Sequence, residues 1–157
     1  MPSAKLDALW ADYAEHHRAG GNQLCHMLGI PLIILGLLGL LLALPHFRIV
    51  GFEADWAMAL VVVAGVAYLW LDPRLGAAMI AADVVLYLVA RQLNWKIALA
   101  LFLAGWVFQF IGHGVYEKRA PAFSKNLAHL LVGPLWVLNH AVHLRREGSQ
   151  PAASVQG

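Results

Sequence analysis

The chain has 157 residues, of which 61% are hydrophobic and 13% are charged, with a formal net charge of +2. A soluble domain carries about twice as many charged residues and has too little interior at this size to bury so much apolar surface. These values exclude a disordered chain and a nucleic-acid-binding protein. They predict an integral membrane protein with a single domain over residues 1–146 and a disordered tail over 147–157.

The N-terminal segment is predicted to form an amphipathic helix that ends at Gly20-Gly21. Its charged side chains lie away from an apolar face, which is typical of a helix that lies on a membrane surface or covers a bundle. The residues that share the apolar face are Leu6, Leu9, Trp10, Tyr13, Ala14 and His17.

Five apolar segments follow, and we expect an all-α membrane bundle of four to five spans. A helix needs about 20 apolar residues to cross a hydrocarbon core of about 30 Å. The segments are residues 27–44, 56–71, 75–90, 97–112 and 127–144. Gly133-Pro134 interrupts the fifth segment, which either crosses fully or turns back there. We favour the turn, which would return Arg145 and Arg146 to the cytoplasmic side.

The positive charges predict the orientation of the chain in the membrane. An even number of predicted crossings separates the main groups, so all of them can be cytoplasmic under the positive-inside rule. These groups are Lys5, Arg18, Arg74, Lys118, Arg119 and Lys125. We expect a bacterial inner-membrane protein, while an internal eukaryotic membrane stays open as an alternative. The sequence makes no prediction of the oligomeric state.

Eight histidines stand out among so few polar residues. Four of them lie near predicted membrane ends on the cytoplasmic side. His17 closes the amphipathic helix, and His26 opens the first span after a Gly-Gly turn that allows both imidazoles to converge. His113 ends the fourth span, and His140 lies on the fifth segment. Imidazole is a common ligand for Fe, Zn, Cu and Ni, and polar groups are costly at the membrane, so this cluster indicates a metal site.

Other polar residues receive different interpretations. Glu117 lies one helical turn after His113 and could complete a ligand set. Asp83 lies inside the third span, where an ionisable group indicates either a functional site or a shallow, hydrogen-bonded carboxylate. His46 and His129 are interpreted as interfacial or hydrogen-bonded residues rather than ligands.

Two stretches of the sequence resemble the family of membrane 2-hydroxy fatty acid dioxygenases. The first has the pattern Tyr13-x3-His17-x4-Asn22-x3-His26-x2-Gly29-x-Pro31. The second is GWVFQFIGHGVYEKRAPA at residues 105–122, followed by Asn126-Leu127. The resemblance implies an Fe(II)-dependent enzyme of fatty-acid α-oxidation that uses O₂ to convert a 2-hydroxy fatty acid into a product one carbon shorter.

The resemblance also implies roles for particular residues. His17, His26 and His113 are expected to bind the iron, with His140 or Glu117 as the fourth candidate. Asn22 is expected to orient a ligand or the substrate carboxylate. The family often has a glutamate where this chain has His140, so that position could provide a ligand or only support one.

The chemistry of a 2-hydroxy acid agrees with this expectation. Its carboxylate and hydroxyl oxygens can chelate one iron, which leaves room for O₂ and removes the need for a separate 2-oxo acid. The apolar spans are expected to hold the acyl tail with loose selectivity for its length, because burying each CH₂ is worth about 0.8 kcal/mol in either lipid or protein. A haem-binding cytochrome, a non-catalytic lipid-binding bundle and a zinc hydrolase remain alternatives.

Overall fold

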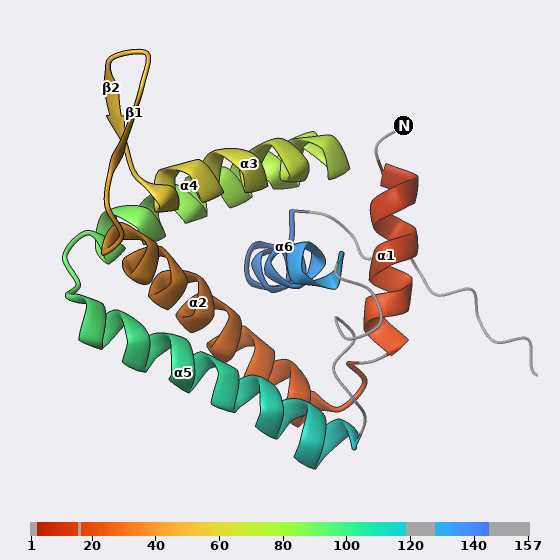
Figure 1. Cartoon of the computed structure of the whole chain (residues 1–157). Coiled ribbons are helices and arrows are strands. Elements are labelled where there is room, and N and C mark those ends of the chain that lie inside the picture. Colours follow the sequence, from red (N-terminus) through yellow and green to blue (C-terminus); the bar gives the residue numbers. More distant parts are fainter. Residues whose placement is uncertain (1–2, 16, 119–127, 145–157) are drawn as a thin grey trace, which may run out of the picture.

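The computed structural model describes residues 3–15, 17–118 and 128–144 (Figure 1). Within these ranges the chain forms mainly helices, as predicted, together with one short β-hairpin. The elements are α1 (Ser3–Glu15), α2 (Gly20–Leu42), β1 (Phe47–Ile49), β2 (Phe52–Ala54), α3 (Trp56–Leu71), α4 (Pro73–Ala90), α5 (Trp95–Ile111), the π-helix η1 (Gly112–Glu117) and α6 (His129–Val142). The tail predicted to be disordered, residues 147–157, lies outside the described residues.

Within the described residues, three helical stretches are long and apolar enough to cross a membrane. They are α2, α4 and the continuous helix formed by α5 and η1. Helix α3 has 16 residues and α6 has 14, which correspond to lengths of about 24 Å and 21 Å at 1.5 Å per residue. Large apolar side chains also cover the outer faces of the bundle, among them Val62, Val63, Val66, Val85, Leu88, Leu103, Val107 and Phe110. Such a surface is expected to face lipid, so the chain is a membrane protein.

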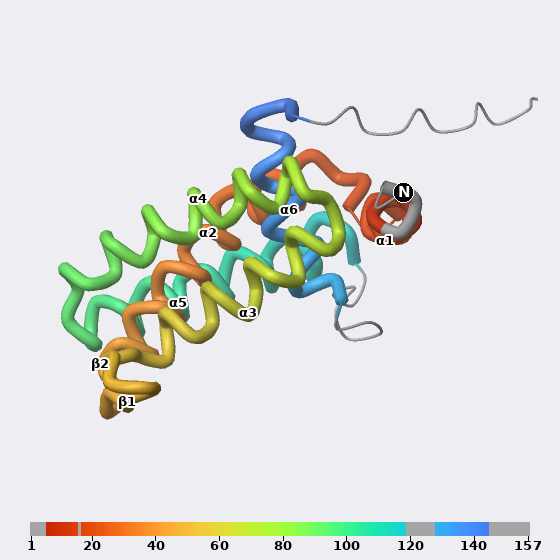
Figure 2. The backbone as a smooth tube through the Cα atoms, turned by 90° about the horizontal axis from the view of Figure 1, so that it is seen from above, coloured from red at the N-terminus to blue at the C-terminus, as the bar shows by residue number. Residues whose placement is uncertain are grey.

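The helices form two pairs with α6 between them. Helices α2 and α5 lie side by side, and α3 and α4 form a second pair (Figures 1 and 2). Figure 1 shows α6 end-on but α2 and α5 from the side, so α6 runs across the bundle rather than along it. Helix α1 stands at the end of the bundle where α2 begins and α5 ends, and it packs against α6.

Close glycine packing fixes the register of α2 against α5. A Cβ atom added at Gly36 would lie 2.6 Å from the carbonyl oxygen of Ala98, and one at Gly105 would lie 2.7 Å from the carbonyl oxygen of Gly29. Small residues allow helix backbones in a membrane to approach this closely. The start of α2 is thereby held beside the end of α5, where the candidate site lies.

Each helix of the α3–α4 pair begins at an aspartate cap. Asp55 accepts hydrogen bonds from the Met58 N–H at 2.8 Å and from the Tyr87 hydroxyl of α4 at 2.7 Å. Asp72 accepts from the N–H groups of Arg74 and Leu75, and Pro73 begins α4. Proline suits a first helical position because the N–H it lacks would have no partner there.

Removing the Asp55 cap is expected to weaken the contact between α3 and α4. Asp55→Ala removes the helix cap and the partner of the Tyr87 hydroxyl, and it should lower the free energy of unfolding by about 1–2 kcal/mol. Unfolding in mixed detergent micelles measures this change. Glu53→Ala, in an exposed ion pair with Arg48, serves as the control and should change stability by less than about 0.5 kcal/mol.

Two predictions about helix ends are wrong. Gly20 and Gly21 begin α2 instead of separating two helices. Gly21 is needed for packing, because a Cβ there would overlap the ring of Tyr116. Helix α6 also continues through Gly133-Pro134 without turning back. Gly133 packs against Ile30 of α2, and a proline within a membrane helix is tolerated because neighbouring groups compensate for the missing hydrogen bond.

The hairpin between α2 and α3 was not predicted. Strands β1 and β2 pair in antiparallel fashion around Val50 and Gly51, which have φ values of 48° and 85°. Positive φ at both central residues is the geometry of a two-residue turn that matches the twist of the flanking strands. The hairpin lies at the far end of the bundle from the candidate site (Figure 1).

Candidate metal centre

Three buried histidines meet where α2 begins and α5 ends. His17 lies in the turn before α2, His26 on the second turn of α2, and His113 in η1, and each side chain is 3% exposed. One ring nitrogen from each histidine lies within 4.8 Å of the other two. Imidazole nitrogens at this spacing form a group that can hold a metal ion.

Backbone carbonyl groups orient two of the three imidazoles. Nδ1 of His17 lies 2.6 Å from the carbonyl oxygen of Tyr13, and Nδ1 of His26 lies 2.9 Å from that of Asn22. A carbonyl oxygen only accepts hydrogen bonds, so each Nδ1 carries the proton and donates it. This tautomer directs the lone pair of each Nε2 toward the centre of the group, as is usual for histidines that bind metals.

The two Nε2 atoms need a cation between them. They lie 3.0 Å apart, and with both Nδ1 atoms protonated each neutral ring presents a lone pair to the other. Such a contact is repulsive unless a proton or a metal ion separates the nitrogens. The His113 ring lies 5.0 Å and 4.8 Å, between ring centroids, from those of His17 and His26. The donor set therefore fits a metal ion bound by three imidazoles.

Glu117 and Asn22 connect the elements that carry the histidines. Oε1 of Glu117 accepts a hydrogen bond from the Ala19 N–H at 2.7 Å and one from Nδ2 of Asn22 at 3.3 Å. Ala19 precedes the first turn of α2, where a negative charge is also favourable for the helix dipole. A Cβ at Gly112 would overlap Oδ1 of Asn22, so this glycine allows η1 to approach α2. Glu117 thus joins the end of η1 to the start of α2.

The other predicted ligand candidate, His140, lies elsewhere. It is exposed on α6 and stacks on Trp136 with 5.2 Å between ring centroids. Among the described residues, neither His140 nor Glu117 belongs to the three-histidine group. His129, interpreted from the sequence as an interfacial or hydrogen-bonded residue, is buried, and its Nε2 lies 2.8 Å from a carboxylate oxygen of Asp12.

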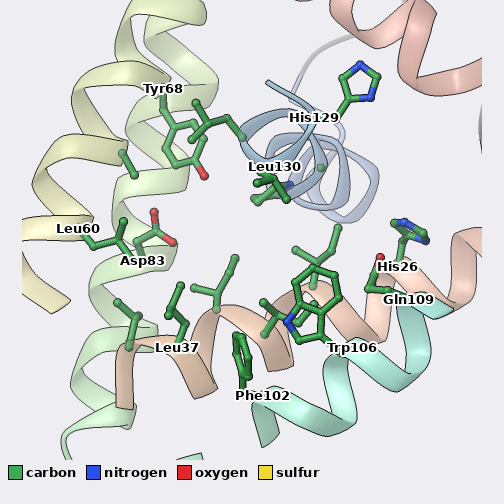
Figure 3. Close-up of a pocket in the computed structure, with 18 of the residues that line it drawn as sticks. His26, Leu37, Leu60, Tyr68, Asp83, Phe102, Trp106, Gln109, His129 and Leu130 are labelled. Carbon is green, nitrogen blue, oxygen red and sulfur yellow. The ribbon is translucent and has the colours of Figure 1, made fainter. Parts of the chain in front are cut away.

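A cavity of about 420 Å³ extends from the histidines into the bundle. Its middle is lined by apolar side chains of several helices, including Ile33, Leu37, Leu60, Phe102 and Trp106. Figure 3 shows His26 and Gln109 on one side of this space and Tyr68 and Asp83 on the other. The volume lies within the range of about 300–1,000 Å³ that is typical of small-molecule sites. The cavity can hold an apolar chain whose polar end meets the histidines.

Two further polar residues lie beside the histidines and were given no role from the sequence, although both fall within the two stretches that resemble the family. The Tyr13 ring stacks on His17 at 3.7 Å, and Gln109 lies one helical turn before His113. Within the described ranges, the Tyr13 hydroxyl and Nε2 of Gln109 have no hydrogen-bond partner although both are buried. Burial also raises the pKa of the Tyr13 phenol far above its usual range, so it stays neutral and able to donate. Tyr13 lies four residues before His17, and Gln109 lies four residues before His113. This helical spacing was the signal in the sequence that each could lie beside a histidine.

The chain is therefore a helical membrane protein in which three buried histidines meet at the end of an apolar cavity. The family model described as "2-hydroxy-palmitic acid dioxygenase Mpo1-like" matches residues 3–145, and the chain belongs to this family. The chain is 30% identical over 120 residues to the 2-hydroxy-palmitic acid dioxygenase MPO1 of Saccharomyces cerevisiae. This match covers 76% of the chain and 69% of the yeast protein. No solved structure gives a significant match.

Proposed function

We propose that the chain is an Fe(II)-dependent dioxygenase that converts a 2-hydroxy fatty acid into a fatty acid one carbon shorter. The observation that carries this proposal is the meeting of His17, His26 and His113 at the end of an apolar cavity. Family membership supports the substrate class, and the yeast relative is named for 2-hydroxy-palmitic acid. Such a substrate has a polar end for the metal centre and an apolar chain for the cavity.

The proposed reaction balances without a second organic substrate. A 2-hydroxy acid and O₂ give a fatty acid one carbon shorter, CO₂ and water. The C1–C2 bond breaks, the two carbons lose four electrons in total, and O₂ gains them. When bound to the three histidines, Fe(II) would supply redox chemistry and open positions for the substrate oxygens and O₂.

The protein's own residues hold and orient the reacting groups. The Tyr13 and Asn22 carbonyls fix the ring orientations of His17 and His26, and Glu117 holds η1 against α2. The Tyr13 hydroxyl lines the cavity beside the histidines, where it can donate a hydrogen bond to the substrate carboxylate. Gln109 can do the same through its amide. The apolar walls would exclude water from the acyl chain.

The ring geometry disfavours a haem between these histidines. A haem with two axial imidazoles needs a flat slot between them. The three rings instead pack edge to face at centroid distances of 4.4–5.0 Å, which leaves no such slot. Zinc is a second candidate, because three histidines and one open position are also a catalytic zinc site.

We further propose that the protein takes its substrate from the membrane in which it lies. The three histidines lie where α2 begins and η1 ends, so they lie at the same end of two of the candidate spans. A fatty acid in one leaflet would therefore place its carboxylate at the depth of the histidines and its chain along the cavity. The positive-inside rule favours the cytoplasmic side for this end of the bundle.

Metal analysis and turnover test the proposed function together. Protein purified without O₂ and loaded with Fe(II) should hold about one iron per chain, the stoichiometry of one three-imidazole site. It should convert 2-hydroxypalmitic acid into the acid one carbon shorter once O₂ is added. Protein loaded with Zn(II) should show no such conversion, because zinc is not redox-active. Hydrolytic activity with zinc, or iron binding without any cleavage, would contradict the proposal.

A further inference from the structure

A second polar group lies in the cavity opposite the histidines. Asp83 of α4 and Tyr68 of α3 both line the cavity, and each side chain is 4% exposed. Figure 3 shows both on the side of the cavity away from His26, and Leu37 and Leu60 also line the cavity. The proposed reaction takes place at the histidines and does not use this pair.

The Asp83 carboxyl group lacks the partners that the other buried aspartate has. Asp55 accepts hydrogen bonds from a backbone N–H and from the Tyr87 hydroxyl. In the part of the chain that the structure describes, no group donates a hydrogen bond to Asp83, and Tyr68 lies on the same side of the cavity (Figure 3). A buried carboxyl group without a partner is costly at membrane depth, so a partner is expected to enter through the cavity.

Because the cavity runs from the histidines to Asp83, a polar group carried on the acyl chain of the substrate could provide this hydrogen-bond partner. A fatty acid bound with its carboxylate at the histidines would direct its chain toward Asp83 and Tyr68. A chain of CH₂ groups there would remove water from the carboxyl group without replacing its hydrogen bonds. A hydroxyl group could donate to the Asp83 carboxyl and accept from the Tyr68 phenol.

We infer that Asp83 and Tyr68 form a distal subsite that binds a hydroxyl group on the acyl chain. The inference rests on the proposed function, because it assumes that the carboxylate of the acid lies at the histidines. The preferred substrates would then be 2-hydroxy fatty acids with a second hydroxyl group in the distal half of the chain. Asp83 acts as a specificity-determining residue and takes no part in cleavage of the C1–C2 bond.

The test compares 2-hydroxypalmitic acid with analogues that carry one further hydroxyl group at successive distal positions. Binding is measured by competition with a labelled fatty acid, using protein in nanodiscs and without metal, and turnover is measured separately with Fe(II). The wild-type protein should bind the best dihydroxy acid about tenfold more tightly than the parent acid, as expected for one net hydrogen bond pair. Turnover should show the same preference in kcat/KM.

Variants of the subsite should change this preference in different ways. Asp83→Leu should remove it and improve binding of the parent acid, because the unpaired carboxyl group is gone. Asp83→Asn keeps an acceptor and a donor and should retain most of the preference, and Tyr68→Phe should retain part of it. Val85→Leu, a change on the exposed face of the same helix, is the control and should behave like the wild type.

The binding and turnover measurements separate the two proposals. If the wild-type protein prefers a dihydroxy acid in binding but cleaves neither acid, the proposed function fails and the subsite stands. If it cleaves both acids with equal efficiency and binds them equally, with Asp83→Leu unchanged, the subsite is overturned.

Discussion

Replacing His113 with alanine is expected to abolish both metal binding and turnover. His113 is the one proposed ligand that η1 provides, and without it the remaining nitrogens of His17 and His26 would form only a two-imidazole site. Loss of a group that merely orients a ligand costs about 10- to 100-fold in metal affinity or activity. Loss of the ligand itself should exceed about 100-fold. Metal content after dialysis and the rate of chain shortening measure the effect.

His140→Ala is the matched control for this experiment. His140 is exposed on α6 and stacks on Trp136, so its loss should leave iron content and turnover within about twofold of the wild type, as for a surface substitution. Equal losses in both variants would contradict the assignment of the site to three histidines. They would indicate that His140 also binds the metal, as the sequence left open.

Replacing Glu117 should weaken metal binding without removing it. Glu117→Ala breaks the hydrogen bonds to Ala19 and Asn22 that hold η1 against α2, so His113 and His26 lose their fixed spacing. The affinity for Fe(II) should fall by about 10- to 100-fold, as for other groups that orient ligands. Glu117→Gln keeps an acceptor oxygen and should lose less. Competition with a metal chelator measures the affinity.

An exposed glutamate provides the comparison for Glu117. Glu53→Ala removes only the hairpin ion pair with Arg48, at the other end of the bundle, and should leave the Fe(II) affinity unchanged. If Glu117→Ala lost metal as completely as His113→Ala, Glu117 would be a ligand. If it bound metal as well as the wild type, the link between η1 and α2 would have no effect on the site.

Much of the helical framework could be predicted from local sequence. Residues 56–71 were predicted as one apolar segment, and α3 covers the same residues because Asp55 caps its start and Asp72-Pro73 begins the next helix. The predicted segment 75–90 lies within α4. Long apolar runs bounded by charged or capping residues define membrane helices without knowledge of their neighbours.

The parts of the site that depend on contacts between distant residues could be predicted only in part. The sequence placed His17, His26 and His113 near one membrane end. It could not separate them from His140, because the position of His140 depends on how α6 runs across the bundle. The use of Gly21 and Gly133 for packing rather than for turns depends on Tyr116 and Ile30, which lie on other elements. The position of Asp83 across the cavity from the histidines likewise requires the packing of α4 against α2 and α6.

The ratio of O₂ consumed to product formed is the sharpest test of the proposed oxidative cleavage at the three histidines. Fe(II)-loaded protein and 2-hydroxypalmitic acid are mixed without O₂ and without any 2-oxo acid, and O₂ is then added in limiting amounts. The proposed reaction should give one shortened fatty acid and one CO₂ for each O₂ consumed, with neither product in His113→Ala. A requirement for an added 2-oxo acid, or consumption of O₂ without cleavage of the C1–C2 bond, would contradict it.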